Sequence, residues 1–165
     1  MENTDIFIRP MESTDNEAVA DLIEEWRDFE ALNLRQHYDR YTLDAVAECA
    51  GRIVGWISYK IKDCNPDVLA EYEDSAEDWL YVVEVYASPS ERRGGIGQAL
   101  MRYVEAEGRA AGVRHSVLMP EADHRTAHGL DQGIYEFYRA LGYDLMKPSP
   151  KHQGAVAPWL MGLRL

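Results

Sequence analysis

The chain has 165 residues, of which 46% are hydrophobic, and its formal net charge at pH 7 is −12. This length favours a single domain over residues 1–165, and a chain near this size buries about 68–70% of its unfolded surface, enough for a core without disulfides or metals. The acidity argues against duplex DNA or RNA as a partner, because nucleic acids bind cationic surfaces, and it suits a cationic substrate, although solubility alone explains it equally well.

The start of the chain predicts a strand and then an amphipathic helix. An apolar run at 6–8 ends at Pro10, as is typical of a short strand. Thr14 and Glu17 have the spacing of a capping box, which predicts the start of a helix. The apolar face of that helix is made by residues at helical spacing: Val19, Leu22, Ile23, Trp26 and Phe29.

A hairpin and a central strand follow. The segments 42–48 and 52–61 flank a short connection, Cys49-Ala50-Gly51, which predicts two antiparallel strands. The polar stretch 63–78 contains seven acids and no basic residue. The next segment, "WLYVVEVYA" at 79–87, is rich in β-branched and aromatic residues and predicts a central strand.

The second half of the chain alternates strands and helices. A glycine-rich loop opens a helix that begins near Ile96 and stops at Gly112. The remaining elements are a strand at 115–119, a helix around Ile134 that ends at Gly142, and strands at 143–146 and 159–165. Antiparallel strands followed by strand–helix units predict a mixed α/β fold, α+β-like, with helices on the faces of a mixed sheet.

The loop "SPSERRGGIGQALM", residues 88–101, carries the main functional signal. Leu100 stands where a dinucleotide-binding G-x-G-x-x-G motif needs its third glycine, and the sequence has no G-K-[ST] P-loop. The remaining pattern is R-x-x-G-x-G between a strand and a helix, where N–H groups of the first helical turn can point at an anion. A glycine-rich turn with solvated arginines is the alternative, and these six residues alone favour neither.

With its flanks included, the chain resembles the GNAT superfamily of acetyl-CoA-dependent N-acetyltransferases. The resemblance runs from "IRP" at 8–10 to the C-terminal strand and is most specific in "VYASPSERRGGIGQAL" (85–100) and "FYRALGY" (137–143). It implies a mostly antiparallel sheet flanked by helices, acetyl-CoA as co-substrate, and Tyr138 as the general acid that protonates the leaving thiolate. The residues that it assigns to the cofactor are Val85, Tyr86 and Ala87 of the strand and Arg92, Arg93, Gly94, Gly95, Ile96, Gly97 and Gln98 of the loop.

Two positions depart from the family pattern. Asp131 stands where the family often has an asparagine that hydrogen-bonds the pantetheine, and an ionised aspartate cannot donate a hydrogen bond. This cofactor contact of Asp131 therefore stays open. Ile134 replaces a small residue, from which we expect a narrower site.

The chemistry requires a base, because an amine must be neutral to attack a thioester and an unperturbed lysine-type amine has a pKa of about 10.4. Glu84 is the leading candidate: it is the only charged residue of the strand at 79–87, and apolar neighbours raise a carboxyl pKa. The alternatives for Glu84 are an outward-pointing side chain or a structural pair with an arginine.

The alternative for Tyr138 is a structural role as an aromatic residue of the core, which is the role that we expect of Phe137. Three acids could hold the substrate ammonium, although such runs are more often only solvated: Glu71, Glu73 and Asp74.

Other features predict no further chemistry. No metal site is expected from four polar residues of a loop-like segment, Asp123, His124, His128 and Asp131. Cys49 and Cys64 suggest neither redox chemistry nor a disulfide. The N-terminus lacks the features of a signal peptide and no stretch is long enough to span a membrane, so we expect a cytoplasmic protein without a membrane partner.

These observations predict an N-acetyltransferase that moves acetyl from acetyl-CoA to a primary amine by direct attack in a ternary complex. A small cationic amine, such as a polyamine or an amino-sugar antibiotic, suits the charge, and a protein α-amine or lysine is the alternative acceptor. A rival of another class is a non-catalytic acyl-CoA-binding or regulatory module, and a third is a structural domain with an ordinary turn at Arg92. The sequence leaves a homodimer open.

Overall fold

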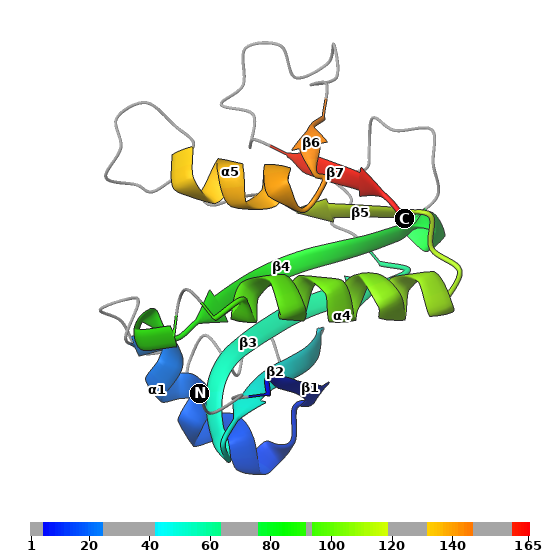
Figure 1. The fold of residues 1–165 in the computed structure, drawn as a ribbon. Coiled ribbons are helices and arrows are strands. Elements are labelled where there is room, and N and C mark those ends of the chain that lie inside the picture. The colour runs from blue at the N-terminus through cyan, green and yellow to red at the C-terminus, as the bar shows by residue number, and fades with distance from the viewer. Residues whose placement is uncertain (1–4, 25–41, 64–75, 92–93, 119–131, 147–159) are drawn as a thin grey trace. The chain divides into compact units, whose positions relative to one another are not determined.

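The computed structural model describes residues 5–24, 42–63, 76–91, 94–118, 132–146 and 160–165 (Figure 1). Within these ranges there are seven strands and three α-helices. In chain order they are β1 (Phe7–Pro10), α1 (Asn16–Glu24), β2 (Leu43–Cys49), β3 (Arg52–Ile61), β4 (Trp79–Ala87), α4 (Ile96–Ala110), β5 (His115–Leu118), α5 (Gln132–Ala140), β6 (Asp144–Leu145) and β7 (Met161–Arg164).

The strands form one sheet in the order β1-β2-β3-β4-β5-β7-β6. Strands β4 and β5 pair in parallel, while β1–β2, β2–β3, β5–β7 and β6–β7 pair antiparallel. The predicted mixed α/β fold with a mostly antiparallel sheet is thus confirmed. The described chain divides into two compact units, Met1–Lys60 with Val83–Glu107 and Ile61–Val82 with Gly108–Leu165. That residues 1–165 act as a single domain stays a prediction.

The first unit contains the predicted hairpin. Strand β3 has the predicted bounds, and β2 extends through Cys49, so that only Ala50 and Gly51 form the turn. Both turn residues have positive φ, 49° and 75°, as a two-residue hairpin turn of type I′ requires. The core of this unit joins α1 to β2, β3 and β4 through buried side chains: Val19, Ala20, Leu22, Ile23, Val46, Trp56 and Tyr86.

The start of the first helix differs from the prediction. A 3-10 turn, Ser13–Asp15, precedes α1, so Thr14 and Glu17 do not form the predicted capping box. Asp15 instead accepts a hydrogen bond from the backbone N–H of Glu12 at 2.8 Å. The reason is Arg9, whose guanidinium holds both carboxylate oxygens of Asp15 at 2.7 and 2.9 Å and brings that side chain to the turn. The predicted apolar face is confirmed at Val19, Leu22 and Ile23, whereas positions 26 and 29 lie outside the described residues.

The second unit contains shorter strands than the sequence predicts. Strand β6 covers only Asp144–Leu145, and β7 covers Met161–Arg164. Tyr143 does not belong to β6, because its N–H donates to the carbonyl of Tyr138 at the end of α5, at 3.0 Å. Among the residues that the structure describes, no helix has both the length and the apolar character needed to cross a bilayer.

Candidate active site

The end of β4 leads directly into the glycine-rich loop. The N–H of Ser88 donates to the carbonyl of Val54 at 2.8 Å, which keeps the chain beside β3 one residue beyond β4. A 3-10 turn, Pro89–Glu91, follows, and Gly94 donates from its N–H to the carbonyl of Glu91 at 2.9 Å. The loop is therefore folded back on itself by its own backbone. Positions 92 and 93 lie outside the described residues, and the roles of the two arginines stay predictions.

Helix α4 begins immediately after Gly95. The carbonyl of Gly95 accepts the first helical hydrogen bond, from the N–H of Ala99 at 2.9 Å, and its φ of +76° is one that side-chain-bearing residues rarely adopt. The next three N–H groups, those of Ile96, Gly97 and Gln98, have no acceptor within the helix by its geometry. The first turn holds no acidic residue. This helix start can accordingly receive an anion, which both the N–H groups and the helix dipole favour.

The rest of α4 is anchored by apolar side chains. Ile96 is 3% exposed, and over the next two turns Leu100, Met101 and Val104 are fully buried. The buried side chains of α4 consequently hold its first turn in place, while Gly94, Gly95 and Gln98 remain exposed.

The predicted residues of β4 fall into two groups. Tyr86 is buried, and its ring stacks on Trp56 with centroids 5.8 Å apart, so its side chain belongs to the core. Val85, Ala87 and Glu84 are half-buried. Tyr86 can therefore serve a ligand only through its backbone, while the roles of the other three stay predictions.

Tyr138 lies in α5, in the second unit, and is half-buried. Its ring meets those of Phe137 and Tyr143 edge to face, with centroids 5.0 and 6.0 Å apart. Tyr143 is fully buried, and its hydroxyl lies 2.8 Å from Oγ of Ser116 in β5. The Tyr143–Ser116 hydrogen bond thus fixes the ring against which Tyr138 packs.

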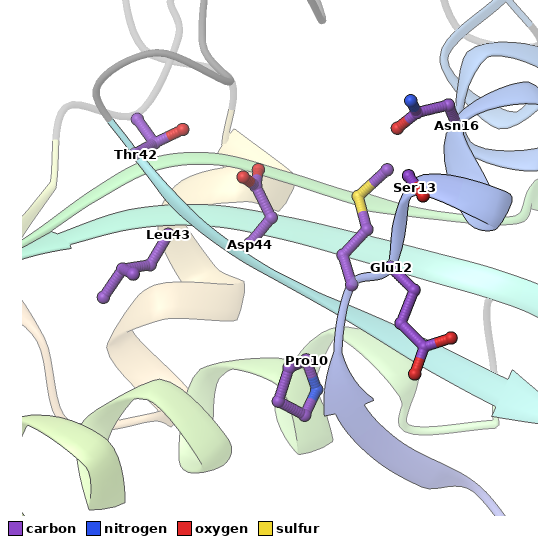
Figure 2. A pocket seen from close by; sticks show the side chains of 8 residues that line it. Pro10, Glu12, Ser13, Asn16, Thr42, Leu43 and Asp44 are labelled. Atoms are coloured by element: carbon purple, nitrogen blue, oxygen red, sulfur yellow. The ribbon is translucent and has the colours of Figure 1, made fainter.

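A separate pocket of about 370 Å³ lies between β1, the start of α1 and the start of β2 (Figure 2). Its lining comprises Pro10, Met11, Glu12, Ser13, Asn16, Thr42, Leu43 and Asp44. Asp44 accepts a hydrogen bond from Nε1 of Trp56 at 3.1 Å. None of the predicted site residues lines this pocket.

The model of the acetyltransferase (GNAT) family matches residues 2–143. The chain belongs to this family. The predicted family and the predicted acetyltransferase activity are thereby confirmed.

Solved structures of other GNAT proteins share the fold. An aminoglycoside 6′-N-acetyltransferase complexed with coenzyme A is 19% identical, with a TM-score of 0.69 and 96% of each chain covered. The ribosomal-protein-S18-alanine N-acetyltransferase from Escherichia coli is 14% identical, with a TM-score of 0.67 over 97% of this chain and 94% of that one. The PaiA N-acetyltransferase from Thermoplasma acidophilum, in complex with coenzyme A, is 16% identical, with a TM-score of 0.65 over 98% and 99%. No curated protein matches the sequence.

Several residues considered for the GNAT site lie outside the described ranges. They are Asp131, the three acids Glu71, Glu73 and Asp74, and the residues weighed as metal ligands, Asp123, His124 and His128. Their roles stay predictions. Within the described part of the chain, no group of three or more histidine, cysteine, aspartate or glutamate side chains could hold a metal ion.

Two features of this GNAT structure were missed at the sequence level. Gly55 lies inside β3, directly beneath Ile96. A glycine inside a strand, here in "RIVGWISYKI", is a recognised sign of a close approach by another part of the chain. The Ser116–Tyr143 hydrogen bond had no such signal, because its partners are distant in the sequence.

Proposed function

We propose that this GNAT protein moves an acetyl group from acetyl-CoA to a primary amine by direct attack in a ternary complex. The observation that carries the proposal is the start of α4, where three N–H groups without helical acceptors follow Gly95 and the first turn of the helix contains no acidic residue. A diphosphate fits these residues, since Gly95 has open space where a Cβ would stand. In support, two of the similar solved structures were determined with coenzyme A.

The N–H groups from Gly94 to Gln98, with Arg92 and Arg93, would bind the diphosphate, and the backbone of Val85 and Ala87 would orient the pantetheine arm. Each hydrogen bond to a charged group contributes about 1.5–3 kcal/mol, so several together outweigh the repulsion from an acidic protein. Acetyl-CoA supplies the activated thioester.

Two side chains would move protons in the proposed reaction. Glu84 removes a proton from the amine, whose nitrogen attacks the thioester carbonyl carbon. The carbon–sulfur bond then breaks, and Tyr138 donates a proton to the leaving sulfur. The ammonium form of the substrate loses two protons in all: one to Glu84 before the attack, and a second from the same nitrogen after the carbon–nitrogen bond forms, which replaces the proton that Tyr138 gives to sulfur. The products are the amide, the free thiol and one proton, which Glu84 releases to solvent. No acetyl–enzyme intermediate is required.

The acceptor we propose is a small cationic amine, because the net charge of −12 attracts cations. The similar solved structures include an aminoglycoside enzyme and one acting on a ribosomal protein, so a protein α-amine or lysine is the second candidate. A cytoplasmic location and a homodimer stay predictions.

Calorimetry with coenzyme A tests the binding half of the proposal, and thiol release with an amine panel tests the catalytic half. The panel contains a polyamine, an amino-sugar antibiotic, a peptide with a free α-amine and a lysine peptide blocked at its N-terminus. We expect binding of coenzyme A and fastest thiol release with a polyamine or amino sugar. Binding without turnover on any amine would favour a regulatory acyl-CoA-binding module. Absence of binding would leave only a structural role for the loop.

A further inference from the structure

Three consecutive residues of β3 contact the end of β4 and the two ends of the loop between β4 and α4. The carbonyl of Val54 accepts the hydrogen bond from Ser88, where the loop begins. Trp56 stacks on Tyr86 near the end of β4. Gly55, between them, faces Ile96, where the loop ends and α4 begins. Residues 54–56 therefore contact the chain on both sides of the loop, at Tyr86 and Ser88 before it and at Ile96 after it.

Gly55 is the point of closest approach. A Cβ at this position would stand 2.6 Å from Cγ2 of Ile96, 3.0 Å from Cδ1 of Leu100 and 3.2 Å from the carbonyl oxygen of Tyr86. The methyl at the end of Leu100 can rotate away. Cγ2 of Ile96 cannot, because it is bonded directly to a Cβ and a β-branched side chain in a helix has one preferred rotamer. A methyl group at position 55 must therefore force β3 and the first turn of α4 apart.

We propose that Gly55 is a positioning residue for acetyl-CoA, an inference that rests on the proposed function. The missing side chain lets Ile96 lie against β3, and this contact sets where the N–H groups of Ile96, Gly97 and Gln98 point. A displaced turn loses alignment with the diphosphate. Losing one hydrogen bond to a charged group weakens binding by roughly ten- to a hundredfold.

Gly108 provides a matched control on the same helix. It lies near the other end of α4, and a Cβ there would stand 2.9 Å from Cγ2 of Val113 and 3.2 Å from Cδ1 of Leu165. Gly108→Ala thus introduces a similar overlap, but far along the helix from the N–H groups at its start. It lowers stability without changing the cofactor contacts.

The experiment compares the wild type, Gly55→Ala, Gly108→Ala, Ile96→Leu and the double variant Gly55→Ala/Ile96→Leu. Leucine has no Cγ2 and keeps the same backbone N–H, so the double variant removes the 2.6 Å overlap and leaves the milder contacts with Leu100 and the Tyr86 carbonyl. For each protein we would measure the dissociation constant for coenzyme A by calorimetry, the KM for acetyl-CoA, kcat, and the melting temperature.

We expect Gly55→Ala to raise the dissociation constant and the KM for acetyl-CoA by about tenfold or more, with a smaller change in kcat. Gly108→Ala should lower the melting temperature but keep the wild-type affinity, and the double variant should recover affinity to within about threefold. If Gly55→Ala does not fold, the double variant alone tests the inference, which then requires that the double variant folds and binds coenzyme A.

Three outcomes would overturn the inference alone, and a fourth would remove it together with the proposed function. Wild-type affinity in folded Gly55→Ala would show that the contact does not set the cofactor site, and the proposed function would survive. Equal losses of affinity in Gly55→Ala and Gly108→Ala, or a folded double variant that does not bind, would do the same. Failure of the wild type itself to bind coenzyme A would instead remove the proposed function and this inference together.

Discussion

At the scale of single residues, Arg9 organises the corner between β1 and α1. Its guanidinium makes two hydrogen bonds to Asp15, at 2.7 and 2.9 Å, and a third to Oε2 of Glu48 at 3.0 Å. Asp15 is 7% exposed. The hydrogen bonds from Arg9 lower the pKa of the Asp15 carboxyl below its ordinary value and outweigh the opposite effect of burial. The ionised carboxylate of Asp15 therefore stabilises the corner, and protonation at low pH removes this stabilisation.

Replacing Asp15 by asparagine should lower the free energy of unfolding by roughly 2–3 kcal/mol at neutral pH, because the hydrogen bonds to a charged group are lost. A carboxyl with a depressed pKa in the folded state stabilises the protein above its unfolded pKa, 3.8, and this contribution is lost as pH falls through the folded value. The difference between wild type and Asp15→Asn should hence shrink below about pH 4. Urea unfolding followed from about pH 7 to about pH 3 measures it, and a difference independent of pH would contradict this account.

Tyr138 and Tyr143 make a pair of contrasting tyrosines. Tyr143 is buried and hydrogen-bonded to Ser116. Tyr138 is half-buried, and its ring meets that of Tyr143 edge to face. Tyr138→Phe should lower kcat by about 10²–10⁴-fold, the usual contribution of a general acid, while the affinity for acetyl-CoA stays nearly unchanged. Steady-state kinetics over a range of pH measure this effect.

Tyr143→Phe is the control for that experiment. It keeps the ring that supports Tyr138 but leaves Ser116 without its buried partner, which costs about 1–3 kcal/mol of stability. We expect a lower melting temperature and an unchanged kcat. Equal turnover of Tyr138→Phe and wild type at all pH values would remove Tyr138 from the mechanism.

At the scale of elements, the hairpin between β2 and β3 has a residue that does not suit its turn. Ala50 has a φ of 49°, and a side-chain-bearing residue in this left-handed region costs roughly 1–2 kcal/mol. Asparagine tolerates the conformation, and Asn-Gly is the preferred pair for a two-residue hairpin turn.

Ala50→Asn should therefore raise the free energy of unfolding by about 0.5–1 kcal/mol, as measured by urea unfolding. Ala50→Val, which places a β-branched side chain at positive φ, should lower it. The substituted side chain is exposed, so neither change affects core packing. A destabilised asparagine variant would mean that the turn adopts another conformation in solution.

Elements with long and uniform patterns matched their predicted bounds. Strands β3 and β4 begin and end where the sequence indicates, because their apolar and β-branched runs are bounded by turn residues or charges. The start of α4 at Ile96 was also readable, since glycines end the strand–loop segment and apolar spacing begins there. The lengths of β6 and β7 were overestimated, because the apolar residues Tyr143, Met146 and Leu160 next to these strands pack in the core although they lie outside the strands.

At the scale of the whole molecule, the net charge of −12 should govern the encounter with the acceptor. Long-range attraction of a cation weakens with salt, because the Debye length falls from about 30 Å at 0.01 M to about 8 Å at 0.15 M. We expect kcat/KM for a polyamine to fall several-fold over about this range.

An acceptor with a single positive charge is the control for this salt dependence. Its kcat/KM should change much less over the same salt series, because steering scales with the charge of the substrate. Equal slopes for the two amines would show that the acidity only keeps the protein in solution. Coenzyme A affinity, measured in the same buffers, separates effects on the cofactor from effects on the acceptor.

The sequence by itself determined the features that depend on neighbouring residues: the helix and strand periodicities, the start of α4 at Ile96 after its glycines, and the family. These follow from local backbone geometry and hydrogen bonding, which a short stretch of chain specifies. Only the tertiary structure decided that Gly55 lies beneath Ile96, that Tyr143 is hydrogen-bonded to Ser116, and that Asp15, held by Arg9, belongs to a 3-10 turn before α1. Such contacts join residues that are separated in the sequence. They arise because the interior is closely packed, so that each position accepts only side chains of a certain size or, as at Gly55, no side chain at all.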